Sequence, residues 1–152
     1  MRVTFGELVV NDLSSFKVDY ATFISSKYVV SLDVLEYAAK KAVENWEKGR
    51  RISKALPIEI LLYCAATRQI KDALKLGVVE GINRVAAVIL DESRMSEVEF
   101  TETEFRPEYD LRAVMDFYGI TDEEITITGI EKLPLLLRER IALFSVFGER
   151  VK

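Results

Sequence analysis

The stretch "PIEILLYCAATRQIKDALKLGV", residues Pro57–Val78, carries the strongest single indication of the fold. Its first nine residues, Pro57–Ala65, are almost all apolar and alternate little, which is typical of a central strand covered on both faces. Thr67 is a candidate cap for a short helix over Arg68–Leu76, and Gly77 suits the left-handed position that ends a helix. The sequence therefore predicts a strand, a tight turn and a helix N-terminus, a combination that often holds an anion.

The segments around this stretch predict the rest of an α/β domain. Residues Val3–Val10 are apolar and β-branched, as in an opening strand, and a brief strand is expected near Tyr28–Val30. Ser31 is expected to cap an amphipathic helix of about 17 residues that ends at Gly49. A buried strand over Arg84–Asp91 then completes the spacing of a strand–helix–strand crossover, although the sequence leaves the strand direction open. These segments predict an α/β fold: a single compact domain with a mixed central β-sheet flanked by helices.

The C-terminal third is predicted from shorter signals. A weak edge strand is expected at Val98–Glu102, followed by a helix from about Pro107 to Gly119. The segment "ITITGI", Ile125–Ile130, has the β-branched alternation of a strand. The last helix is expected to begin near Pro134, since proline is favoured in the first turn.

The composition favours one domain, residues 1–152, that is not an enzyme. The chain is 49% hydrophobic, which suits one sizeable core, and no apolar run approaches the length of a membrane span. The first residues do not read as a signal peptide, and Cys64 is the only cysteine, so a cytoplasmic location is expected. Histidine is absent, which removes the commonest general base and metal ligand. We therefore expect no catalytic residue, no metal and no cofactor.

Charge is distributed unevenly along the chain. The net charge is −4, yet residues 1–76 carry +3 and residues 77–152 carry −7. A basic segment, Lys48–Lys54, holds four cations in seven residues, and the segment Asp91–Asp110 holds eight acids and two arginines. The overall charge argues against indiscriminate binding of nucleic acid, but the basic segment leaves a local anion site open.

The last helix has more apolar side chains than one stripe requires. With a step of about 100° per residue, they fall on several sides of the helix. Two interpretations remain open: an unusually deep core helix, or a face that docks another protein. If it is a docking face, the candidate residues are Leu136, Leu137, Ile141 and Phe144.

The order and spacing of several short motifs resemble a known family. In chain order, these motifs are a helix with two alanines and lysines, a glycine, a basic stretch, a Glu-Ile element and a second helix that ends in glycine. These motifs are Ala38–Ala42, Gly49, Arg50-Arg51, Glu59-Ile60 and Ala73–Val78. Over roughly Tyr28–Asp91 the chain resembles the TPRKB family (PRPK-binding protein), the small subunit of the KEOPS complex, and its short length resembles the archaeal type.

This resemblance implies a role in a tRNA-modifying assembly. Members of the family bind the kinase-like ATPase subunit of KEOPS (the PRPK family), and through it the rest of the complex. The complex installs threonylcarbamoyladenosine (t6A) in certain tRNAs, and archaeal small subunits also hold the tRNA acceptor end with its 3′ CCA tail. The resemblance therefore implies a cytoplasmic, non-catalytic, regulatory subunit with tRNA and a kinase-like protein as partners and with no membrane association.

Single-stranded RNA ends are held by cations along the phosphates and by side chains that stack on bases. Two groups of residues are candidates, one at each end of the predicted strand Pro57–Ala65 and about 25 Å apart at a strand's rise. They are Arg50, Arg51 and Lys54 before it, and Arg68, Gln69 and Lys71 after it. The turn Cys64-Ala65-Ala66 departs from the family, whose members often have glycine or serine there.

Two other functions compete with this interpretation. The chain could be a protein-interaction module that regulates a kinase-like partner without contacting RNA. It could also be a small hydrolase or transferase that uses carboxylates such as Glu59 or Asp91. The missing histidine, metal cluster and phosphate loop weigh against the enzyme.

Overall fold

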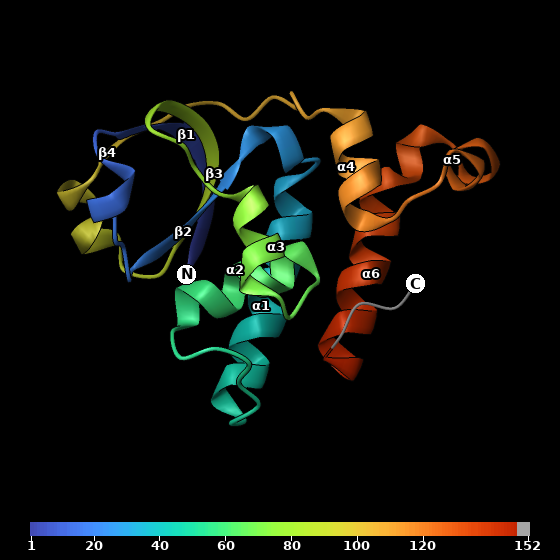
Figure 1. Ribbon diagram of the computed structural model, residues 1–152, viewed down its shortest axis with the longest axis horizontal. Helices are drawn as coiled ribbons and strands as arrows, with labels where there is room; N and C mark the ends of the chain where they lie inside the picture. The colour runs from blue at the N-terminus through green and yellow to red at the C-terminus, as the bar shows by residue number, and fades with distance from the viewer. Residues whose placement is uncertain (149–152) are drawn as a thin grey trace.

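Four strands form one sheet in a computed structural model that describes residues 1–148 (Figure 1). The order is β2-β3-β1-β4, and each neighbouring pair is antiparallel. The predicted single domain with a central sheet and flanking helices is confirmed, but every strand pair is antiparallel, so the sheet is not mixed. The strands are β1 (Arg2–Val10), β2 (Ala21–Ser25), β3 (Gly81–Ile89) and β4 (Glu99–Glu102).

The helices are gathered mainly on one side of the sheet and beyond it (Figure 1). The α-helices are α1 (Leu32–Glu47), α2 (Leu56–Ala65), α3 (Ile70–Ala73), α4 (Leu111–Tyr118), α5 (Asp122–Thr128) and α6 (Leu133–Phe147). Short 3-10 helices lie between them: η1 (Leu13–Ser15), η2 (Ser26–Tyr28), η3 (Leu74–Leu76), η4 (Glu92–Glu97) and η5 (Ile130–Lys132).

Side chains alternate along the strands, so each face of the sheet has its own core. One face, which includes Phe5, Ile24 and Val88, packs against the helices. The other face, which includes Leu8 and Phe23, is covered only by 3-10 helices and loops. Burial on both faces explains why β3 reads as a nearly continuous apolar run.

The stretch predicted as a central strand, Pro57–Ala65, is helix α2, so this prediction was wrong. Helix α2 packs against α1, α6 and β2 and is buried around most of its circumference. A helix covered on all sides has no polar stripe, and in a short segment this looks the same as a buried strand. The predicted crossover therefore does not exist: β2 and β3 are antiparallel neighbours, and both α1 and α2 lie in the connection between them.

Helix α2 ends at a left-handed residue, Ala66, with φ of 51°. The Ala66 N–H donates to the Tyr63 oxygen at 3.1 Å, and the Thr67 N–H donates to the Leu62 oxygen at 3.1 Å. These two bonds make the Schellman ending of a helix, where glycine is usual because it adopts positive φ without strain. Within residues 1–148, Ala66 is the only non-glycine residue with positive φ. The family departure at this turn is therefore an alanine in a conformation that favours glycine.

The helix predicted over Arg68–Leu76 is shorter and begins later. Helix α3 starts at Ile70 and continues into η3, and Thr67 Oγ1 accepts only the Gln69 N–H, at 3.2 Å. One helical turn has a weak dipole, so this N-terminus alone does not make an anion site.

Other expectations have mixed outcomes. The predicted helix from Ser31 to Gly49 and the C-terminal helix starting near Pro134 are confirmed, as is the weak edge strand β4. The segment Ile125–Ile130, predicted as a strand, instead lies in α5 and η5, because Thr121 and Glu124 form a capping box that starts a helix. The strand expected at Tyr28–Val30 is also wrong: β2 precedes it.

Candidate functional site

Arginines without a carboxylate partner concentrate at the two ends of α2. Of the ten arginines within residues 1–148, six form ion pairs with Asp or Glu: Arg2, Arg84, Arg94, Arg106, Arg112 and Arg140. The other four are Arg50, Arg51, Arg68 and Arg138. Three of these four belong to the groups that the sequence singled out. An unpaired guanidinium keeps its charge free for an external anion.

The segment before α2, the basic loop Lys48–Lys54, is held in place by one buried carboxylate. Glu59 is fully buried and accepts the Ile52 N–H at 2.9 Å and the Ser53 N–H at 2.8 Å. The Ser53 hydroxyl also donates to it, at 2.8 Å. Because these bonds fix the loop backbone, its cations are presented from a defined conformation.

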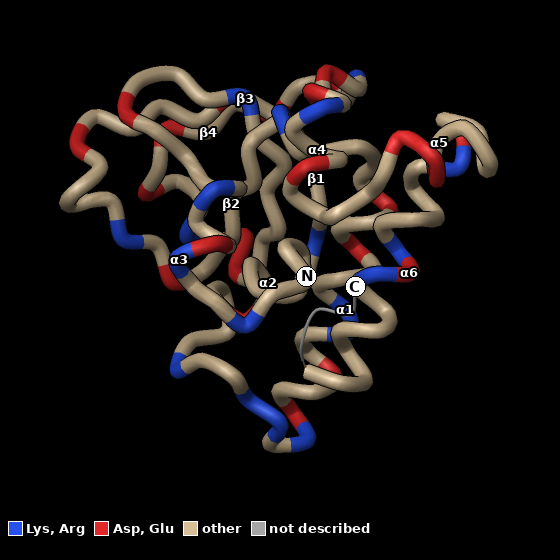
Figure 2. Tube along the Cα trace, turned by 45° about the vertical axis from the view of Figure 1, so that its right-hand side comes forward, with Lys and Arg blue, Asp and Glu red and all other residues tan. Residues whose placement is uncertain are grey.

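The cations of the basic loop lie at the surface. Arg50, Arg51 and Lys54 are exposed. The Arg51 guanidinium lies 4.1 Å from the centre of the Trp46 ring, and its Nε donates to the Trp46 oxygen at 3.1 Å. Stacking on an indole orients the guanidinium while leaving most of its N–H groups available. Figure 2 shows the basic residues of this loop together at one end of the molecule.

At the other end of α2, Arg68, Gln69 and Lys71 are exposed. Arg68 Nη1 donates to the Gly148 oxygen at 3.0 Å, so Arg68 rests against the C-terminal end of α6. This bond links the turn after α2 to a helix about 80 residues away in the chain. Gln69 and Lys71 have no side-chain hydrogen bond or ion pair with any residue of the described chain.

The element between the two groups is shorter than the sequence suggested. They flank a ten-residue helix, and at 1.5 Å per residue α2 spans about 15 Å. A strand would have separated them by about 25 Å. The six predicted side chains therefore lie beyond the two ends of one short helix.

The candidate docking residues of α6 are mostly in the core. Leu137, Ile141 and Phe144 are each at most 2% exposed, and only Leu136 is half-buried. They face the helical core because α6 packs against α1 and α2. In this structure these three side chains are therefore part of the core and do not offer a free surface to a partner.

Exposed apolar surface lies instead at the two ends of α6. Leu135 is 56% exposed near its start, and Ile127 (76%) and Ile130 (48%) are exposed on the two short helices that precede α6. Val146 and Phe147 are exposed at its other end, next to Gly148 and its bond from Arg68. We call Ile127, Ile130 and Leu135 the α5–α6 patch.

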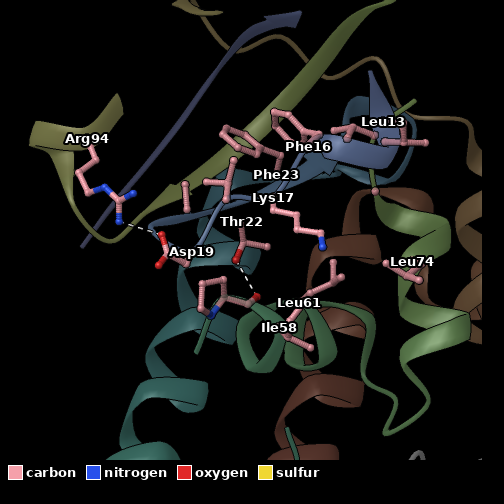
Figure 3. A pocket seen from close by; sticks show the side chains of 15 residues that line it. Leu13, Phe16, Lys17, Asp19, Thr22, Phe23, Ile58, Leu61, Leu74 and Arg94 are labelled. Carbon is pink, nitrogen blue, oxygen red and sulfur yellow. Dashed lines mark hydrogen bonds and ion pairs between the residues drawn. The ribbon is translucent and has the colours of Figure 1, made fainter. Parts of the chain in front are cut away.

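The structure also has a groove that the sequence did not indicate. It has a volume of about 850 Å³ and lies between β2, α2, η3 and the segment before β2 (Figure 3). Its walls are largely apolar, with Phe16 and Phe23 on one side and Ile58 and Leu61 of α2 on the other. Thr22 Oγ1 donates to the Pro57 oxygen at 2.7 Å, which joins the two walls. Because the lining comes from separate chain segments, no local sequence pattern reveals it.

The carboxylates considered for catalysis both have structural partners. Glu59 holds the basic loop, and Asp91 Oδ1 accepts the N–H and hydroxyl of Ser93 at the start of η4. Burial raises the pKa of the Cys64 thiol to about 12, which leaves it protonated and unreactive at neutral pH. Within residues 1–148, no three His, Cys, Asp or Glu side chains come together as possible metal ligands.

A family model matches most of the chain. The model of the family described as kinase binding protein CGI-121 matches residues 7–144. The search of curated proteins finds no match. Among the helices of the described chain, none has the length and apolar character needed to span a membrane.

Proposed function

Because this chain belongs to the CGI-121 family of kinase-binding proteins, we propose that it is a non-catalytic KEOPS subunit that binds the kinase-like ATPase of the complex and the tRNA acceptor end. In this role it supports t6A modification of tRNA without carrying out chemistry itself. The family match over residues 7–144 carries the kinase-binding part of the proposal. The tRNA part depends on the unpaired cations around α2.

Those cations have the character of an RNA-end site. Single-stranded ends are bound by cations that follow the phosphates, together with flat side chains that stack. The basic loop offers Arg50 and Lys54 as cations and an Arg51–Trp46 stack, and the opposite end of α2 offers Arg68 and Lys71. Since successive phosphates are several ångströms apart, two groups at the ends of a helix about 15 Å long suit a short single strand.

The α5–α6 patch is the surface that we assign to the kinase-like partner. Its three aliphatic side chains are exposed and lie on α5, η5 and α6, and η5 contacts both α5 and α6. It lies on the side of the molecule away from the sheet (Figure 1). An exposed aliphatic cluster on helices is a typical protein-docking surface.

Binding of intact and CCA-trimmed tRNA over a salt series tests the RNA part. Trimming should weaken binding, because non-specific attraction to phosphates is nearly the same for both RNAs. The triple variant Arg68→Ala, Gln69→Ala, Lys71→Ala should bind intact tRNA as weakly as the normal protein binds trimmed tRNA. Arg112→Ala is the control: Arg112 is exposed but paired with Asp122 at 2.8 Å, and its loss should have little effect. Equal binding of both RNAs would remove the acceptor-end assignment.

Co-purification with the kinase-like subunit tests the docking part. Ile127→Asp and Leu135→Asp each place a charge in the patch and should abolish association, since an unpaired buried charge is costly at an interface. Val79→Asp is the control, because Val79 is 63% exposed but lies outside the patch. Association that survives both patch variants would refute this surface.

The competing function, a kinase-regulating module without RNA contact, makes a different prediction. If this function is the right one, the patch variants should no longer associate with the kinase-like subunit, and the unchanged chain should show no saturable binding of intact tRNA. The same two experiments therefore separate the two functions.

A further inference from the structure

Strand β2 lies at an edge of the sheet with one side unpaired. The Tyr20 oxygen accepts the Leu90 N–H at 2.8 Å, which sets the alternation of bonds along the pair β2–β3. In an antiparallel pair every second residue bonds to the neighbouring strand, so the N–H and C=O of Ala21 and Phe23 point away from β3. No other described residue accepts from or donates to these main-chain groups.

This unpaired edge borders the groove. Ala21, Thr22 and Phe23 line it, and Ile58 and Leu61 of α2 face them across it (Figure 3). Ala21 and Phe23 are themselves at most 7% exposed, so water has limited access to the strand. The groove therefore combines apolar walls with main-chain donors and acceptors that repeat about every 7 Å. An extended polypeptide offers the matching repeat, whereas the bases of an RNA end do not.

A cation gives the groove a charge preference. Lys17 is exposed, lines the groove and extends over it in Figure 3. It forms no ion pair with any residue in the described part of the chain, whereas the other cation on the lining, Arg94, is paired with Asp19 at 2.8 Å. The free charge therefore favours an occupant with a carboxylate near Lys17.

We propose that the groove binds an extended segment of another protein, which adds to β2 as a fifth strand. The segment is about five residues long, the length of β2, with apolar side chains directed into the groove and one acidic residue opposite Lys17. This contact is separate from the α5–α6 patch and from the cations around α2. It adds a second protein-binding site to the proposed function and does not depend on that function.

Synthetic peptides with blocked amides test the pairing directly. The probes are capped peptides in which valine and threonine alternate after an N-terminal glutamate, in a version without methylation and in two N-methylated versions. One version is methylated at odd residues and the other at even residues, so only one of them blocks the N–H groups that face β2. Strand addition predicts that one methylated peptide binds about tenfold or more weakly, while the other binds like the unmodified peptide.

Amide hydrogen exchange of the full chain gives the matching readout on the protein. The unmodified peptide should slow exchange at Ala21 and Phe23 about tenfold or more, because these N–H groups gain partners. Lys17→Glu should weaken the peptide about fivefold by replacing an attraction with a repulsion. The Ile127→Asp variant should bind the peptide with the same affinity as the unchanged chain, which separates this site from the surface assigned to the kinase-like partner.

Several results would overturn the proposal. They are equal binding of both methylated peptides, no binding up to about 1 mM peptide, and protection of Ala21 and Phe23 by a CCA-ended oligonucleotide in place of the peptide. Protection that rises with protein concentration alone would assign the groove to a second copy of this chain.

Discussion

Replacing Glu59 with glutamine tests whether one buried carboxylate holds the basic loop. Glutamine has the same shape but only one acceptor oxygen, and its second group is a donor. In the native chain Oε1 accepts the N–H and hydroxyl of Ser53, both at 2.8 Å, and Oε2 accepts the Ile52 N–H at 2.9 Å. The Ile52 N–H also donates to Oε1, at 3.2 Å. If the amide oxygen takes the Oε1 position, the amide nitrogen faces the Ile52 N–H, and that donor keeps only its longer bond, at 3.2 Å, to the remaining oxygen.

The expected loss follows from these contacts. A half-buried N–H without any partner costs about 1–3 kcal/mol, and an N–H that keeps only a long, shared bond loses part of that amount. Bonds to a charged acceptor are also stronger than bonds to a neutral one by about 1 kcal/mol. The neutral amide is cheaper to bury than a carboxylate, which offsets part of this loss. We therefore expect Glu59→Gln to lower the free energy of unfolding by about 2 kcal/mol. For a chain of this length this lowers the melting temperature by roughly 4–8 °C.

Urea unfolding and native-state hydrogen exchange check this expectation. The amides of Ile52 and Ser53 should lose protection, while amides in the middle of α1 should change only with global stability. Glu47→Gln is the matched control: Glu47 is exposed at the end of α1, close to the basic loop, and has no ion pair with a described residue. This variant removes the same charge and should change stability by less than about 0.5 kcal/mol.

The tRNA affinity of Glu59→Gln distinguishes two explanations of how the basic loop binds RNA, because they predict changes in opposite directions. If charge alone decides binding, Glu59→Gln should bind tRNA more tightly, since it removes a negative charge beside the basic loop. If the fixed loop conformation matters, binding should weaken while Glu47→Gln does not. Unchanged stability together with intact protection of Ile52 and Ser53 would refute the role assigned to Glu59.

Three further predictions follow from single positions. Burial raises the pKa of Cys64 to about 12, so its thiol should react with Ellman's reagent near pH 8 only after denaturant is added. Ala66→Val should lower the free energy of unfolding by about 2 kcal/mol or more in urea titrations, because a β-branched residue fits poorly at φ of 51° in a fully buried position. Arg2 hydrogen-bonds Glu92 and Glu102 and lowers the pKa of both below the usual 4.5, so they stabilise the fold above that pH and lose this effect as the pH falls through the lowered values. The urea midpoint of the unchanged chain should therefore fall when the pH is lowered from about 7 to about 3, and the midpoint of Arg2→Met should fall by less.

Elements with local signals were predicted well from the sequence. Helix α1 has a capping serine at its start, an apolar face at helical spacing and Gly49 with φ of 78° after its end. Each signal acts within a few residues, so the sequence alone is enough to indicate this helix. The five cations at the ends of α2 were also identified from local charge, and all five are exposed in the structure.

Helix α2 shows why other parts were missed. Its signals for a helix were present, since Pro57 lies in the first turn with Glu59 two residues later. The apolar run outweighed them because α1, α6 and β2 together cover most of the circumference of this helix, and its remaining side faces the apolar groove. How many neighbours surround a segment depends on the packing of distant elements, and periodicity within one segment does not contain that information.

Helix α6 shows the same limit for function. The sequence correctly indicated that its apolar surface exceeds one stripe, but it left open whether the core or a partner covers the excess. Only the packing of α6 against α1 and α2 decided that Leu137, Ile141 and Phe144 are core residues and that Leu135 is exposed. The sequence by itself determined the strongly capped helices, the charged groups and the absence of histidine. The tertiary structure decided the strand pairing, the groove and the free surfaces, because these depend on contacts between residues far apart in the chain.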